Sequence, residues 1–341
     1  MLHTARNTIG SRDQEAMSRK NSIKLGILLP TRGVLLKERS LPDLSPIFEL
    51  ASYADEAGLD SVWVGDSLLA KPRLEPLATL ASIAMKTQHV RLGTAVMLAP
   101  LRHPVHLAQM AATVDLISGG RLTLGMGVGG VFTDAQKAEW AAVSVPYQER
   151  GRRLTELVQV CRNLWTNDNV TFHGKYYDVK NANMLPKPLQ SGGVPILLAC
   201  HLATGSEAQY QRAGYYADGI ISISDSPVQY AQTLQRVQGY ALEAGRDPAE
   251  LITTFYMTVN LHQDREIAWR EADSFIRDYY GLNFWAGKWG PFGPPHEVAH
   301  RILEYYNAGA QEIIVRFASY DQLPQLQTFV RDVMPIIQRV V

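Results

Sequence analysis

Short apolar segments alternate with longer helical segments along most of the chain, and this alternation limits the fold more than any other feature. Strands that alternate with helices form βαβ units, in which the strands run parallel. Eight such units predict an α/β fold, a closed (β/α)8 TIM barrel, with insertions after strands 4 and 7. The segments that we expect to be barrel strands are residues 23–29, 61–65, 91–98, 121–126, 195–199, 218–222, 252–260 and 312–317.

The barrel domain is expected to span residues 23–341, because no proline-rich or serine-rich linker divides this part of the chain. Residues 1–22 are polar and mixed in charge, and they lack the apolar core of a signal peptide. We therefore expect them to form a disordered N-terminal tail. Residues 281–294 are rich in glycine, proline and aromatic residues, a composition typical of a lid or an interface loop.

Charge and cysteine content argue against several classes of partner. The 33 basic and 33 acidic side chains balance, whereas nucleic-acid binding depends on basic residues that neutralise phosphates. No basic run or long apolar run predicts contact with a membrane. Cys161 and Cys200 are too few for a disulfide framework, and the pair His103 and His106 has no evident third metal ligand. We expect a cytoplasmic protein that binds no metal, membrane or nucleic acid.

Three polar residues follow predicted strands, at the rim where TIM-barrel active sites lie. Asp66 ends the second strand, and it can either bind a cofactor or substrate or cap a turn. His201 ends the fifth strand and titrates near neutral pH, so it can move a proton or play a structural role. We predict Asp66 and His201 as catalytic residues. Arg316 ends the eighth strand, where it can reach a cofactor or an anionic substrate, or form a salt bridge.

Two glycine-containing segments are candidate cofactor sites. Residues 125–130 fit the GxGxxG dinucleotide pattern, but they follow the fourth strand and open no clean helix. We therefore expect Gly127 to leave room for a cofactor, with a tight strand exit as the alternative. The segment Thr204, Gly205 and Ser206 opens a predicted helix over 204–213, where free amides and the helix dipole favour a phosphate. The alternative there is simple N-capping by Thr204.

Four segments together resemble the bacterial luciferase-like monooxygenase family. Each is weakly specific alone, but their order and spacing are similar to those of the family over about residues 23–335. The resemblance implies a TIM barrel whose mouth holds reduced FMN or the deazaflavin coenzyme F420. The four segments are residues 54–66, residues 90–96 with 102–105, residues 116–127, and residues 217–220 after Gly205 and Ser206.

The resemblance also implies roles for particular residues. Thr94, Ala95 and Val96 end the third strand, where family members often have a cis peptide bond that supports the cofactor ring. We thus predict a cis bond between Ala95 and Val96; the alternative is an ordinary barrel strand. Many deazaflavin-dependent members have a histidine directly after the aspartate that corresponds to Asp66, whereas this chain has Ser67. This departure favours FMN over the deazaflavin.

The resemblance, together with the departure at Ser67, implies a flavin-dependent monooxygenase that uses reduced FMN and O₂ on a small organic substrate. The resemblance implies a separate flavin reductase as the source of reduced FMN, and a homodimer. One alternative is an F420-dependent reductase or dehydrogenase that transfers hydride. Another is a barrel that binds flavin without catalysis.

Overall fold

A closed barrel of eight parallel strands forms the centre of the computed structural model, which describes residues 22–37, 41–203, 205–281, 283 and 289–340. The barrel closes because β9 pairs in parallel with both β8 and β11. The predicted (β/α)8 fold is therefore confirmed. The barrel strands are β1 (Lys24–Leu28), β2 (Ser61–Val64), β3 (Arg91–Met97), β4 (Leu122–Met126), β7 (Ile196–Ala199), β8 (Gly219–Ile223), β9 (Ile252–Leu261) and β11 (Glu312–Phe317).

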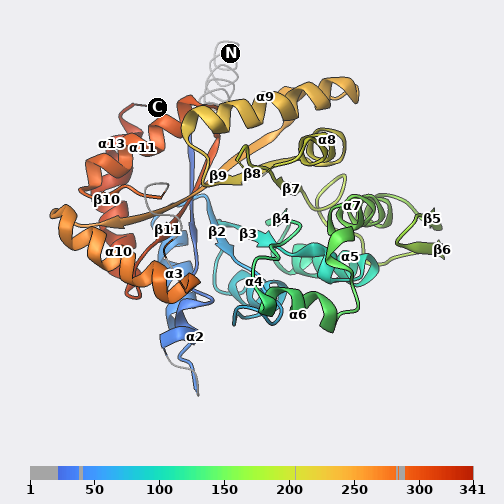
Figure 1. The fold of residues 1–341 in the computed structure, drawn as a ribbon, viewed down its shortest axis with the longest axis horizontal. Helices are drawn as coiled ribbons and strands as arrows, with labels where there is room; N and C mark the ends of the chain where they lie inside the picture. The colour runs from blue at the N-terminus through green and yellow to red at the C-terminus, as the bar shows by residue number, and fades with distance from the viewer. Residues whose placement is uncertain (1–21, 38–40, 204, 282, 284–288, 341) are drawn as a thin grey trace, which may run out of the picture.

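Helices surround these central strands (Figure 1). Apolar residues of the helices and of the outward faces of the strands form one large buried cluster between the two layers. The helices are α2 (Gly33–Lys37), α3 (Ser45–Glu56), α4 (Pro76–Ala84), α5 (Pro104–Ile117), α6 (Asp134–Ala142), α7 (Arg150–Thr166), α8 (Glu207–Tyr216), α9 (Pro227–Glu243), α10 (Arg265–Tyr280), α11 (Pro295–Asn307), α12 (Gln322–Thr328) and α13 (Met334–Gln338). No helix in the described ranges is both long enough and apolar enough to cross a membrane.

The interior of the barrel is filled by a second apolar cluster, which includes Trp63, Leu197 and Ile314. Every residue of β2, β4 and β11 is buried, as expected for parallel strands that are covered on both faces. The indole of Trp63 lies against the backbone of Gly93 on the neighbouring strand, where a Cβ atom would come within 2.1 Å of Trp63 Cε3. Glycine at this position therefore lets the largest interior side chain fit.

Acidic residues of the family-like segments hold the starts of the barrel strands. Asp55 accepts hydrogen bonds from three successive backbone amides in residues 88–90, directly before β3. Burial acts to raise the pKa of Asp55, but these three bonds outweigh it and lower the pKa. Asp218 accepts hydrogen bonds from the Ile196 amide, at 2.7 Å, and from Arg162, at 2.5 Å. These carboxylates therefore stabilise the frame of the barrel.

The two insertions lie where the sequence places them. After β4 come α6 and α7, and then a hairpin of β5 (Val170–His173) and β6 (Asp178–Ala182). Residues 174–177 form the turn of this hairpin, and His173 pairs with Asp178 at the end of the strands. Glu156 on α7 accepts hydrogen bonds from the amides of residues 175–177 and so holds the turn in place. After β9 come α10 and the short strand β10 (Phe292–Gly293), which pairs with the end of β9.

Candidate active site

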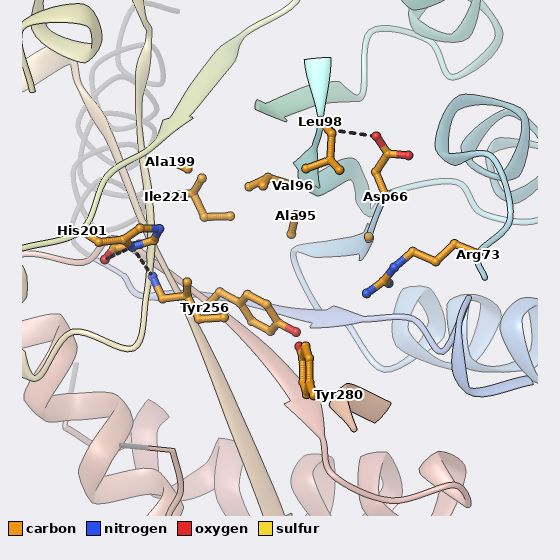
Figure 2. A pocket seen from close by; sticks show the side chains of 13 residues that line it. Asp66, Arg73, Ala95, Val96, Leu98, Ala199, His201, Ile221, Tyr256 and Tyr280 are labelled. Carbon is orange, nitrogen blue, oxygen red and sulfur yellow. Dashed lines mark hydrogen bonds between the residues drawn. The ribbon is translucent and has the colours of Figure 1, made fainter. Parts of the chain in front are cut away.

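A cavity of ≈ 190 Å³ opens at the carboxyl ends of the barrel strands (Figure 2). This is the end at which TIM-barrel enzymes place their active sites. The ends of β2, β3, β7 and β8 contribute most of its lining. The loop after β2, strand β9 and the end of α10 complete it. The lining residues are Gly65, Asp66, Arg73, Ala95, Val96, Leu98, Ala199, His201, Ile221, Ser222, Ile223, Tyr256 and Tyr280.

Small apolar side chains form one wall of the cavity. Ala95, Val96, Ala199 and Ile221 come from three strands and lie beside one another (Figure 2). The peptide bond between Ala95 and Val96 is cis, as the family resemblance implies. Thr94 lies behind this wall, where its hydroxyl donates a hydrogen bond to the Gly125 carbonyl at 2.8 Å. Thr94 thus connects β3 to β4 and is absent from the cavity lining.

Gly127 lies behind the same wall, directly after β4. A Cβ atom at this position would come within 2.9 Å of Val96 Cγ2 and 3.5 Å of Ala199 Cβ. Its amide donates a hydrogen bond to the Met97 carbonyl at 2.8 Å, so the backbone there is held to β3. Glycine therefore keeps the wall flat, and the role of Gly127 in leaving room for a cofactor stays a prediction.

Asp66 reaches the cavity, but other protein groups occupy both of its carboxylate oxygens. Oδ2 accepts hydrogen bonds from the Leu98 amide at 2.8 Å and from Arg102 Nη1 at 2.6 Å. Oδ1 accepts a bond from Arg102 Nη2 at 3.0 Å. The side chain is only 1% exposed. Asp66 therefore lies at the mouth of the barrel, as predicted. Its hydrogen bonds hold the segment after β3 in position and leave neither oxygen free for proton transfer.

The loop after β2 is held in place by α6. Ser67 donates a hydrogen bond to Glu139 Oε1 at 2.9 Å, and the same oxygen accepts bonds from the amides of Leu69 and Ala70. Glu139 is itself buried. The hydroxyl of Ser67, at the position where many deazaflavin-dependent family members have histidine, thus has a structural partner. The insertion after β4 thereby shapes the rim of the cavity.

His201 lies at the rim of the cavity on the opposite side from Asp66 (Figure 2). Its Nδ1 accepts a hydrogen bond from the Ile223 amide at 3.3 Å and lies 3.4 Å from the Ser222 hydroxyl. Burial lowers the pKa of His201, and the charge of Asp225 opposes this only in part. The imidazole is therefore neutral at pH 7. Because Nδ1 is an acceptor, the remaining proton lies on Nε2.

The predicted phosphate site lies at the start of α8. This helix begins at Glu207, so the prediction that it begins at Thr204 is wrong; Thr204 itself lies outside the described residues. Ser206 is the N-cap, and its side chain caps no amide of the helix. A Cβ atom at Gly205 would come within 2.2 Å of the His201 carbonyl oxygen, so only glycine fits here. Amides of the first turn therefore have no side-chain cap and can receive an anion.

Several cavity residues were not expected from the sequence. Arg73 lies in the loop after β2, Tyr256 within β9, and Tyr280 at the end of α10. Arg316, which we expected near the rim, donates a hydrogen bond to the Tyr280 hydroxyl at 2.6 Å. The sequence gives little indication that these residues line the cavity. The one hint is that Arg73 follows Asp66, at a predicted strand end, by seven residues.

The barrel and its cavity define a class: a TIM-barrel protein with a small-molecule site at the carboxyl ends of its strands. The profile of the luciferase-like monooxygenase family matches residues 23–289. The chain therefore belongs to this family. It is 30% identical over 322 residues to an F420-dependent glucose-6-phosphate dehydrogenase of Kineococcus radiotolerans, covering 85% of this chain and 92% of the relative. A protein of the same name from Amycolatopsis mediterranei is 29% identical and covers 85% and 93%.

Solved structures show the same fold. A monooxygenase from Streptomyces bottropensis matches with a TM-score of 0.78 and 23% identity, covering 92% of this chain and 99% of that one. An F420-dependent secondary alcohol dehydrogenase matches with a TM-score of 0.76 and 20% identity, covering 93% and 99%. The sequence relatives correct our expectation of a monooxygenase that uses FMN. Those that match most of this chain are named as F420-dependent dehydrogenases, which favours the alternative.

Proposed function

We propose that this chain is an F420-dependent oxidoreductase that exchanges hydride with a small organic substrate, as a dehydrogenase or a reductase. The sequence relatives support this proposal, because they are named as F420-dependent dehydrogenases. The match to this chain covers 93% and 92% of their length. The observation in the structure that carries it is the flat apolar wall of the cavity, which faces a neutral histidine at the rim.

The residues present fit such a cofactor. Ala95, Val96 and Ala199 would contact one face of the planar ring, and Gly127 keeps this wall flat. The uncapped first turn of α8, next to Gly205, would bind the phosphate of the coenzyme. When bound, F420 supplies hydride transfer in place of oxygen activation.

His201 is the residue that we assign to the reacting oxygen of the substrate. The Ile223 amide fixes its neutral tautomer, so Nε2–H can donate a hydrogen bond into the cavity. Such a bond stabilises the negative charge that develops on oxygen while a C–O bond changes between alcohol and carbonyl. The Ser222 hydroxyl donates its hydrogen to the Asp225 carboxylate at 3.1 Å, so it does not compete with the Ile223 amide as the donor to Nδ1. His201 does not take the hydroxyl proton itself, so that proton goes to solvent when the alcohol is oxidised and returns from solvent when the carbonyl is reduced.

Turnover with each cofactor tests this proposal. The purified protein is mixed without oxygen with oxidised F420 and a panel that includes a secondary alcohol and glucose 6-phosphate. We expect the visible absorbance of oxidised F420 to fall with at least one compound. The matched reaction supplies reduced FMN, O₂ and the same panel, and we expect no substrate-dependent oxygen consumption. Oxygen consumption with reduced FMN, and no reaction with F420, would contradict the proposal.

A further inference from the structure

Three guanidinium groups surround one tyrosine ring beside the cavity. The Cζ atoms of Arg32, Arg73 and Arg316 lie 5.1, 5.3 and 5.1 Å from the centre of the Tyr279 ring. These arginines come from distant places in the sequence: the turn after β1, the loop after β2, and β11. The fold thus gathers three positive charges on one side of the barrel mouth.

A fourth cation belongs to the same group. Lys71 Nζ lies 4.9 Å from the centre of the Tyr280 ring, and Tyr280 lines the cavity. Burial lowers the pKa of Lys71, and the charges of Arg32 and Arg73 lower it further. The four cations, which we call the basic cluster, therefore repel one another. Such a concentration of like charge favours the entry of an anion.

No carboxylate in the described part of the chain forms an ion pair with the basic cluster at up to 4.0 Å. Several of its nitrogens are also buried without a hydrogen-bond partner: Arg32 Nε and Nη1, Arg73 Nε and Nη1, and Arg316 Nη2. Arg32 is 8% exposed and Arg316 is 1% exposed. Buried charges normally have partners, because an unpaired one loses its hydration without compensation.

The surrounding aromatic rings do not replace an anion. Cation–π contacts stabilise a guanidinium, but they leave its in-plane N–H groups without acceptors. Burial raises the pKa of Tyr256, which keeps that phenol neutral although Arg316 opposes the effect. The charge of Glu139 acts to raise the pKa of Lys71, but this carboxylate already accepts three hydrogen bonds from the loop after β2. The cluster thus keeps unused donors for a ligand.

We propose that the basic cluster binds an oxyanion, a phosphate or carboxylate group, that the substrate carries. Arg73 connects the cluster to the reacting centre, because its side chain lines the same cavity as the apolar wall (Figure 2). Gly65 makes room for it: a Cβ atom there would come within 2.3 Å of Arg73 Nη1. The anionic end of the substrate binds at the cluster, and its reacting carbon lies against the apolar wall. The assignment of this oxyanion to the substrate rests on the proposed function.

Anion binding can be measured without cofactor or turnover. Inorganic phosphate, and in a parallel arm malonate, is titrated calorimetrically into the full-length protein. We expect saturable binding of at least one of them, and the tighter ligand identifies the oxyanion. Arg73→Met and Arg32→Met should each weaken that binding at least tenfold. The matched control is Arg270→Met, which removes a 64% exposed charge on α10 and should bind like the wild type.

Arg73→Lys is the second variant in case the Met variants fail to fold. It keeps the charge but lacks the planar fork, so we expect a smaller loss of anion affinity than for Met. In wild-type protein saturated with F420, whose phosphate we assign to the first turn of α8, the anion should still bind, and Arg32→Met should remove that binding. These results separate the basic cluster from the cofactor site. The inference is overturned if neither anion binds, if the variants bind like the wild type, or if saturation with F420 abolishes anion binding to the wild type.

Discussion

Replacing Gly127 with alanine tests whether the flat apolar wall holds the cofactor ring. The added Cβ atom would lie 2.9 Å from Val96 Cγ2, whereas ordinary contacts begin at 3.4 Å. Val96 must therefore move by about 0.5 Å, and we expect it to move toward the cavity. The φ angle of Gly127 is not in the left-handed region, so the backbone itself accepts alanine.

We expect Gly127→Ala to weaken F420 binding about tenfold, which corresponds to about 1.4 kcal/mol. The free energy of unfolding should fall by only about 1 kcal/mol, as for a mild case of overpacking. F420 titration by fluorescence and urea denaturation measure the two effects. The matched control is Gly239→Ala on α9, where a Cβ atom meets nothing within 4 Å. Unchanged F420 affinity in a folded Gly127→Ala protein would refute the role of the wall.

Two further variants test the polar residues at the rim. His201→Leu should lower kcat with F420 about 100-fold, because leucine cannot donate a hydrogen bond to the developing oxygen charge, whereas His300→Leu on α11, 75% exposed, should not. The pKa of His201 lies below its ordinary value of 6.5, so wild-type kcat should hold at neutral pH and fall as acidification protonates Nδ1 and breaks the bond from Ile223. An unchanged pH profile in the His201→Leu variant would contradict this. Asp66→Asn should reduce the free energy of unfolding by about 3 kcal/mol in urea denaturation, because it breaks a buried pair with Arg102. Loss of turnover at full stability would instead assign Asp66 to the chemistry.

The barrel was predictable from the sequence because its strands are buried on both faces. Such strands appear as near-continuous apolar runs, and β7 (ILLA) and residues 313–315 of β11 (IIV) are of this kind. The cis bond between Ala95 and Val96 was predicted only through the family resemblance. Acidic residues of the family-like segments, such as Asp55 and Asp218, hold strand starts at positions away from the cavity. Their presence therefore indicates the fold and carries no information about the reaction.

The parts of the site that the sequence did not reveal depend on long-range contacts. Glu139 lies 72 positions from Ser67, so nothing local predicts that α6 holds the loop after β2. The basic cluster likewise combines segments that meet only in the closed barrel. The absence of histidine at Ser67 led us to favour FMN, which the relatives contradict. Because the fold can supply an imidazole from another strand, as His201 shows, one position cannot decide the cofactor.

The most direct test of the central claim is the affinity of the purified protein for oxidised F420 and for FMN, measured side by side by calorimetry. A barrel mouth built for the deazaflavin should bind F420 at one site per chain, at least tenfold more tightly than FMN. Tighter binding of FMN, or no binding of F420, would contradict the account.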